Sequence, residues 1–202
     1  MTITLPKPQL WIIAGPNGSG KSTAYSILGV ESPKDTVWII NPDLLAKRIA
    51  EDEKLALNDA NLAAVIRIET WLYASVAAYQ TIGVETVLST PKYRRLVSLA
   101  KKLQFEFNLI YVLLDTPERN VERVRLRVAK GGHNVPKAKI LERYDRSLRQ
   151  LPWFLQQADR AYIFDNSGSE PRQIGEKKGG VLVLDPSVLP PIVTVAQRIR
   201  DR

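Results

Sequence analysis

The chain contains no cysteine and only one histidine, His133, and these shortages exclude several kinds of site. Without cysteine there is no disulfide, no thiolate-bound zinc or iron–sulfur cluster, and no thiol nucleophile. A single imidazole also excludes a histidine-rich metal centre. The chain has no apolar run long enough to cross a bilayer, and residues 1–10 lack the apolar segment of a signal peptide. We therefore expect a cytoplasmic protein with no membrane partner.

The rest of the composition is that of an ordinary globular protein. The 202 residues are 45% hydrophobic and 25% charged, which predicts a single domain over residues 1–202. The net charge of +8 is uneven: residues 1–90 hold 7 bases and 9 acids, whereas residues 91–202 hold 22 bases and 12 acids. The basic half suggests an anionic partner, which could be nucleotide phosphates, nucleic acid or an acidic protein. A merely solvated basic face is the alternative.

Apolar runs alternate with segments of helical periodicity along most of the chain. Because the runs are continuous and not alternating, they predict strands buried on both faces of a parallel sheet. We expect an α/β fold of the P-loop NTPase type, with an open five-stranded parallel sheet flanked by helices. The five expected strands are at 10–14, 37–40, 84–88, 109–114 and 161–164. A sixth run at 181–184 would add an edge strand, and a basic helix or tail would follow it to residue 202.

A phosphate-binding motif follows the first expected strand. Residues 15–22 read Gly-Pro-Asn-Gly-Ser-Gly-Lys-Ser, a full match to G-x-x-x-x-G-K-[ST]. The pattern predicts backbone N–H groups turned into one concavity, with Lys21 at the β- and γ-phosphates of ATP and the Ser22 hydroxyl on Mg²⁺. The residues expected to bind the nucleotide are Gly15, Pro16, Asn17, Gly18, Ser19, Gly20, Lys21, Ser22 and Thr23. The Asn-Lys-x-Asp sequence that GTPases use to bind guanine is absent from the chain.

Three acidic positions are candidates for chemistry beside the phosphates. Asp43 follows Asn41 and Pro42, which predict a helix start at the carboxyl edge of the sheet. There it could accept the proton of a hydroxyl that attacks the γ-phosphate, or it could only complement the helix dipole. Glu85, followed by Thr86, lies in an apolar strand. It could bind a substrate hydroxyl or a Mg²⁺-bound water, or form a structural ion pair with a buried arginine. Asp115 could support the metal or cap the next helix.

The segment from about 117 to 150 predicts a helical lid rich in arginine. Arginines over the phosphates would stabilise the charge on the transferring group. On helical spacing Arg119, Arg123 and Arg127 share one face, Arg125 points elsewhere, and Arg143 and Arg146 follow on a second helix. We assign catalysis to Arg127 and Arg143, and a solvated face to Arg119 and Arg125. His133 is expected to make a turn or lid contact.

Together these motifs resemble the zeta-toxin-like P-loop kinases, in particular the group of predicted ABC-type ATPases. The resemblance rests on residues 15–23, 41–43, 85–89, 123–136, 143–147 and 164–167. It implies transfer of the γ-phosphate of ATP to the aminosugar of UDP-N-acetylglucosamine, and restraint by an antitoxin protein. It also implies Asp43 as the base, Lys21 as the phosphate clamp, Arg127 and Arg143 as charge stabilisers, and Asn166 near the ATP base.

One departure from the family leaves the acceptor open. Residues 56–64 lack the usual Gly-Arg on the substrate side, so sugar contacts beyond Asp43, Glu85 and Thr86 are not carried over. A nucleotide or polynucleotide hydroxyl kinase is the alternative enzyme, although no aromatic residues interleave with the basic ones as base stacking would need. A non-catalytic, ATP-dependent interaction switch is the third hypothesis.

Overall fold

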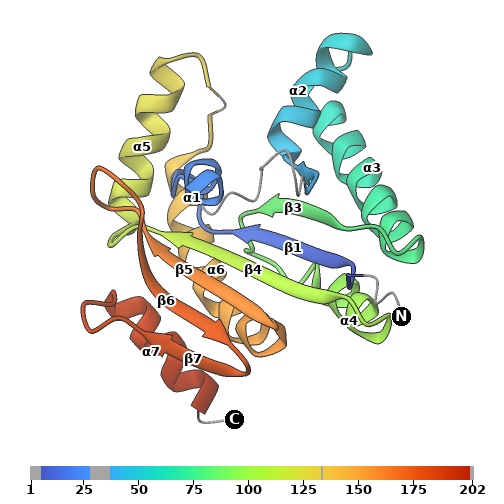
Figure 1. Cartoon of the computed structure of the whole chain (residues 1–202). Coiled ribbons are helices and arrows are strands. Elements are labelled where there is room, and N and C mark those ends of the chain that lie inside the picture. The colour runs from blue at the N-terminus through green and yellow to red at the C-terminus, as the bar shows by residue number, and fades with distance from the viewer. Residues whose placement is uncertain (1–5, 28–36, 133, 201–202) are drawn as a thin grey trace.

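The computed structural model describes residues 6–27, 37–132 and 134–200, with a seven-stranded sheet at its centre (Figure 1). The strand order is β2-β3-β1-β4-β5-β6-β7. The strands are β1 Gln9–Ala14, β2 Ile39–Ile40, β3 Ile82–Thr86, β4 Glu106–Leu113, β5 Arg160–Asp165, β6 Arg172–Lys178 and β7 Val181–Leu184. The helices are α1 Lys21–Ile27, α2 Pro42–Asp52, α3 Leu57–Ala77, α4 Arg94–Lys102, α5 Pro117–Ala129, α6 Lys137–Gln157 and α7 Pro190–Arg200.

The five expected parallel strands are confirmed as β1 to β5, and two antiparallel strands extend their sheet. β7 is the edge strand expected at 181–184, but it joins the sheet through β6, which the sequence did not predict. β6 reads Arg-Gln-Ile-Gly-Glu-Lys-Lys, with one large apolar residue. Its strand conformation comes from pairing with β5 and β7, since its own residues carry no strand pattern.

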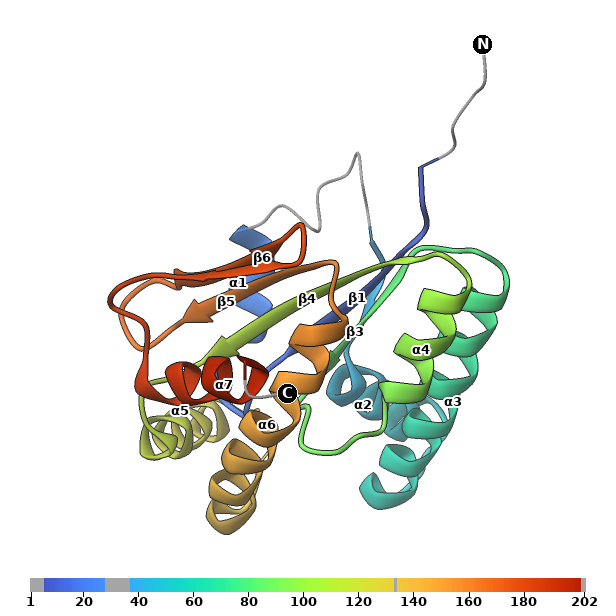
Figure 2. The same cartoon turned by 90° about the horizontal axis from the view of Figure 1, so that it is seen from below.

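The two faces of the sheet are covered unequally, with α1 on one side and α3, α4, α6 and α7 on the other (Figure 2). The larger core lies under the latter helices and includes Phe107, Tyr111 and Phe154. The smaller core packs Ala24 of α1 on Ile13 and Val112. Burial on both faces explains why the parallel strands are continuous apolar runs.

The order of the parallel strands places a crevice at the carboxyl end of β1. The chain leaves β1 for the far edge at β2 and returns through β3, so β1 ends with β3 on one side and β4 on the other. Ligands of open α/β sheets bind at such a switch point. The glycine-rich segment 15–20 leaves β1 at this point.

Two helical arms project from the sheet in Figure 1: α2 with α3, and α5 with the first half of α6. Residues of both arms line the cavities described below. The first arm is held together by small residues, with Ala46 and Ile49 packed on Ala60 and Ala64. α6 extends past the expected lid boundary to Gln157, and its second half joins the core of the sheet. Among the described residues, no helix combines the length and apolarity needed to cross a membrane.

Candidate active site

The phosphate-binding segment has the backbone conformation that its glycines predict. Gly15, Gly18 and Gly20 have φ angles of 148°, 79° and 84°, in the region that other residues avoid. A Cβ atom on Gly20 would also lie 2.1 Å from the side-chain amide nitrogen of Asn166, so a larger residue would clash there in addition to being strained. α1 then begins at Lys21, so that the loop leads into a helix N-terminus. This is the cradle that phosphates bind, and the residues present fit ATP.

Side chains from two other elements hold the loop in place. The buried Asn120 of α5 donates a hydrogen bond of 2.7 Å from its amide to the carbonyl of Asn17. Asn166, after β5, donates one of 2.8 Å to the carbonyl of Ser19, and Arg123 donates one of 2.6 Å to the carbonyl of Asn166. The predicted contact of Asn166 with the ATP base stays a prediction, because its amide nitrogen is directed to the loop.

The sequence did not predict the role of Asn120, and for Arg123 it predicted only a place on a helix face. The spacing of Arg123 four residues before Arg127 was the one available signal. Asn120 offered no signal, because a lone asparagine in a helix reveals a tertiary partner only once the fold is known.

Lys21 lies at the closed end of the loop. Its ammonium donates hydrogen bonds to the carbonyls of Gly15 and Pro16, at 3.1 and 3.3 Å, and lies 3.6 Å from the Glu85 carboxylate. Burial lowers the pKa of Lys21, and the carboxylates of Glu85 and Asp43 offset part of that effect. The positive charge of Arg127 lowers the pKa further. Lys21 therefore lies near two carboxylates and one guanidinium, at the position where the motif predicts the phosphates.

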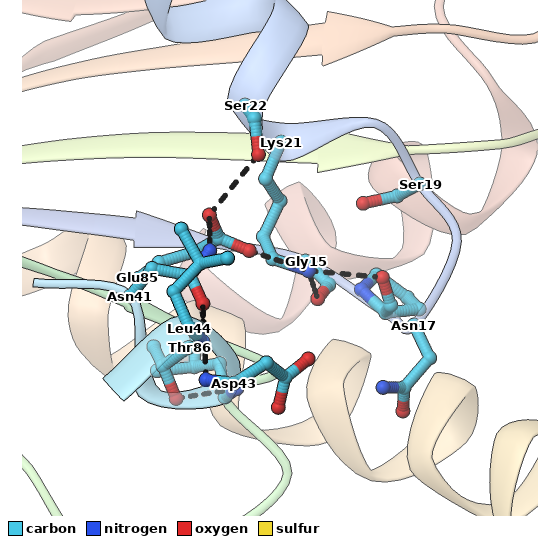
Figure 3. Close-up of polar contacts among 12 residues, drawn as sticks. Gly15, Asn17, Ser19, Lys21, Ser22, Asn41, Asp43, Leu44, Glu85 and Thr86 are labelled. Carbon is cyan, nitrogen blue, oxygen red and sulfur yellow. Dashed lines mark hydrogen bonds and ion pairs between the residues drawn. The ribbon is translucent and has the colours of Figure 1, made fainter. Parts of the chain in front are cut away.

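Glu85, at the carboxyl end of β3, is where several of these groups meet (Figure 3). One carboxylate oxygen accepts a hydrogen bond of 3.3 Å from the Ser22 hydroxyl and one of 3.0 Å from the Asn41 amide. An ion pair with a buried arginine is the alternative that the sequence suggests for Glu85. Its partner is instead Lys21 of the phosphate loop, so this ion pair offsets the free-energy cost of burying an acid in an apolar strand.

The oxygens beside the loop suit Mg²⁺. Ser22 and Glu85 bring a hydroxyl and a carboxylate together, and Mg²⁺ binds such oxygens while keeping waters and phosphate oxygens as its other ligands. Over residues 6–27, 37–132 and 134–200, no group of three or more acidic or histidine side chains forms a full protein cage for a metal. These residues fit a magnesium ion held mainly by the nucleotide.

Asp43 lies in the first turn of α2, where the sequence placed it. Asn41 caps the helix as expected: its side-chain oxygen accepts hydrogen bonds of 3.0 and 3.2 Å from the N–H groups of Asp43 and Leu44. Pro42 occupies the first helical position. Asn41 thus fixes the start of α2 with its oxygen and contacts Glu85 with its nitrogen, so the Asp43 helix and the phosphate loop are linked through one residue.

Asp43 stands between two cavities that meet in the crevice. One, of about 240 Å³, is lined by Lys21, Asp43, Glu85, Thr86, Arg127 and Arg143, among others. The other, of about 500 Å³, is lined by Ser22, Asp43, Lys47, Glu85, Arg127 and Gly132, among others. Asp43, Glu85 and Arg127 therefore face both spaces, and a molecule bound in either would contact them.

The lid arginines separate into two groups. Arg143 reaches back from α6 and donates a hydrogen bond of 3.3 Å to the side chain of Asn17. Arg127, in the last turn of α5, lines the cavities. Arg125 pairs with Glu122 and its side chain is 73% exposed. Arg119 pairs with Asp115 and donates to the carbonyl of Ser167, so it holds the base of the arm.

The structure contradicts one of the two interpretations of Asp115, helix capping, and its support of the metal stays a prediction. Its carboxylate pairs with Arg119 at 3.0 Å, on the α5 side. The hydroxyl of Thr116, not Asp115, caps α5 by accepting from the N–H of Arg119. Capping by Asp115 was therefore wrong by one residue. His133 lies outside the described residues.

Comparisons with solved structures find a similar fold in several proteins. The AvrRxo1-ORF1:AvrRxo1-ORF2 complex aligns with a TM-score of 0.68 at 16% identity, over 96% of this chain and 63% of that one. The PezAT toxin–antitoxin system of Streptococcus pneumoniae aligns with a TM-score of 0.64 at 16% identity, over 98% and 88%. The Pnkp1/Rnl/Hen1 RNA repair complex aligns with a TM-score of 0.56 at 18% identity, over 74% and 47%. The chain thus spans less than two thirds of the AvrRxo1 chain.

Sequence comparison gives a relative and a family. An uncharacterised protein of Haemophilus influenzae is 28% identical over 147 residues, which cover 68% of this chain and 99% of that protein. The AAA domain family profile matches residues 10–151, from β1 through the phosphate loop to the arginine lid and well over half of the chain. The expected P-loop NTPase fold is confirmed, and the chain belongs to the AAA domain family.

Proposed function

We propose that the protein is a kinase that transfers the γ-phosphate of ATP to a hydroxyl of a small molecule. The position of Asp43 carries the proposal: the Asn41 cap fixes this carboxylate in a cavity that it shares with Lys21 and two lid arginines. A protein that only binds Mg-ATP needs the loop, Lys21 and a carboxylate on the metal side such as Glu85, but it does not need Asp43 as a second carboxylate in the same cavity. A phosphotransferase needs such a base.

Each group has a distinct part in the proposed transfer. Asp43 accepts the proton of the acceptor hydroxyl as that oxygen attacks the γ-phosphate. Lys21, Arg127 and Arg143 stabilise the negative charge that spreads over the transferring group. Ser22, with Glu85 beside it, would hold Mg²⁺, and this ion would supply positive charge to the phosphates. Glu85 also orients Ser22 and Asn41, and so keeps the two sides of the site in register.

The walls of the smaller cavity support a polar acceptor that carries several hydroxyls. Thr86, Ser89, Thr90 and Tyr93 line it, with Lys92. Hydroxyl side chains donate and accept hydrogen bonds, so they suit a polyhydroxyl ligand, and lysine suits an anionic group. We favour a UDP-activated aminosugar, as the zeta-toxin resemblance implies, and an antitoxin as protein partner. The fold likeness to the PezAT toxin–antitoxin system and the AvrRxo1 complex supports this.

A polynucleotide hydroxyl is the second candidate acceptor. The basic half of the chain and the fold likeness to the Pnkp1/Rnl/Hen1 RNA repair complex favour it. Its binding should weaken steeply as salt rises, because phosphate contacts release counterions. A nucleotide sugar with two phosphates would show a much smaller salt dependence.

The experiment offers labelled ATP with Mg²⁺ to the purified protein, with nucleotide sugars and short oligonucleotides in parallel. The proposal is supported if the wild-type protein transfers label to a nucleotide sugar and the Asp43→Asn variant does not. Asp52→Asn is the matched control, since Asp52 is an exposed carboxylate at the other end of the same helix. Mg-ATP binding without transfer to any acceptor contradicts the kinase proposal and favours the ATP-dependent switch. Label on the oligonucleotides favours the second candidate.

A further inference from the structure

The turn that follows α5 contains two consecutive glycines with different surroundings. The N–H of Gly131 donates a 2.9 Å hydrogen bond to the carbonyl of Val128, and the N–H of Gly132 donates one of 2.9 Å to the carbonyl of Arg127. With Lys130 as the helix cap, this pair of bonds is the Schellman motif that ends many helices. The motif explains the first glycine, because its position needs the positive φ of 81° that Gly131 has.

The motif does not explain the second glycine. Gly132 has no positive φ, so its φ angle does not itself require glycine. A Cβ atom at Gly132 would lie 2.5 Å from Cγ of Arg127 and 2.9 Å from the Arg127 carbonyl oxygen. At Gly131, by contrast, an added Cβ would meet nothing within 4 Å. Thus the φ angle requires glycine at 131, whereas at 132 a side chain would meet Arg127, most closely at Cγ and also at its carbonyl oxygen.

The contact involves a part of Arg127 that cannot move aside easily. Cγ is one bond beyond Cβ, so displacing it requires a different χ1 rotamer and redirects the rest of the side chain. Schellman motifs often place an apolar side chain at the Gly132 position, against the helical residue that Arg127 occupies here. In this chain Gly132 has no side chain to make that contact, and the aliphatic stem of Arg127 lies where its Cβ would be.

We propose that Gly132 is a positioning residue for Arg127. By having no side chain, it lets the Arg127 stem lie against the end of its own helix, while the guanidinium faces the crevice with Asp43. The benefit of this placement to catalysis rests on the proposed function, but the placement itself can be tested without measuring activity. An alanine at 132 turns Arg127 away from the crevice.

Two measurements test the proposal on Gly132→Ala. The first is its crystal structure, in which Arg127 should adopt a different χ1 rotamer; an unchanged Arg127 side chain overturns the proposal even if the protein transfers no phosphate. The second is a double-mutant cycle on turnover of Mg-ATP. Gly132→Ala should lower kcat about tenfold to a hundredfold in the wild-type chain and less than about twofold in Arg127→Ala. Equal losses in the two backgrounds contradict the proposal.

Controls separate this effect from a damaged turn and from a failed proposed function. Lys130→Ala, an exposed change on the same turn, should leave kcat unchanged. If Gly132→Ala is destabilised, the loss of stability should be smaller in the Arg127→Ala background, which lacks Cγ and keeps only the 2.9 Å approach to the Arg127 carbonyl oxygen; an equal loss in the two backgrounds overturns the proposal. A wild-type protein that turns over no ATP contradicts the proposed function alone, and the Arg127 rotamer then decides.

Discussion

The two helical arms beside the crevice are similar in length but differ in the side chains that they expose and in how they contact the sheet. The α2–α3 arm places one carboxylate, Asp43, in the two cavities and also exposes a series of large apolar side chains: Leu44, Leu57, Leu62, Val65, Ile66, Trp71 and Tyr73. The α5–α6 arm supplies the arginines, and of its described residues only Leu126 is an exposed large apolar side chain. The proposed base and the proposed arginine charge stabilisers therefore come from opposite arms, and the proposed transfer requires both arms at once.

The arms are also attached to the sheet differently. α6 is tied to the end of β4 by the Tyr144 hydroxyl, which donates 2.9 Å to the carbonyl of Leu114, and by a buried Tyr111–Ser147 hydrogen bond of 2.9 Å. Burial raises the pKa of Tyr144 to about 12, so its hydroxyl keeps the proton that it donates. The α2–α3 arm joins the larger core of the sheet through Ile68, Leu72 and Val76 of α3. The Asn41 amide that precedes α2 donates to Glu85 of β3. Hydrogen bonds from α6 thus attach the arginine arm, whereas the helices of the other arm contact the sheet through apolar side chains.

The largest effect should come from Asp43→Asn. If the base is supplied by the α2–α3 arm, kcat falls by about 10² to 10⁴, while the affinity for Mg-ATP stays close to the wild-type value. Steady-state transfer and calorimetric ATP binding measure the two quantities. A parallel loss of both would move Asp43 from catalysis to nucleotide binding.

The arginine arm should give the next largest effect, in Arg143→Ala. Removing one donor to a developing negative charge costs about 10² in kcat. The same change also breaks the 3.3 Å hydrogen bond to Asn17. Arg146→Ala is the control, since Arg146 pairs with Glu142 on the exposed side of the same helix. If the two variants have the same kcat, Arg143 plays no part in transfer.

The attachment of the arginine arm is tested by Tyr144→Phe. The change leaves the buried carbonyl of Leu114 without this donor and should lower the free energy of unfolding by about 1–2 kcal/mol. Urea denaturation measures it. Tyr79→Phe, which removes an exposed hydroxyl, should change stability by less than about 0.5 kcal/mol. Equal effects would mean that the hydrogen bond adds nothing to the attachment.

The smallest effect should come from the apolar surface of α3. Leu62 and Ile66 are 62% and 56% exposed, so Leu62→Gln/Ile66→Gln should change the free energy of unfolding by about 0.5 kcal/mol or less. Ile68→Ala, on the buried face of the same helix, should cost about 2–5 kcal/mol. Thermal denaturation compares them. A large loss of kcat in the glutamine variant would give the apolar arm a part in the chemistry.

The sequence predicted the elements whose signal is local. The phosphate loop, the Asn41 cap with Pro42, and the five parallel strands each depend on a motif or an apolar run in one segment. β6 was missed because its pairing partners, not its residues, make it a strand. Asn120 and Gly132 were missed for a related reason: each acts on a group whose position only the folded chain defines.

The hydrogen bond from Asn166 to Ser19 has a consequence for any shortened form of the protein. The family match ends at residue 151, whereas Asn166 follows β5, fifteen residues later. A chain cut at the end of the match would keep every residue from Gly15 to Thr23. It would nevertheless lose the strand beside β4 and the amide that holds the Ser19 carbonyl. Such a fragment should bind Mg-ATP poorly despite carrying the whole motif, because the folding unit that shapes the nucleotide loop is longer than its sequence signature.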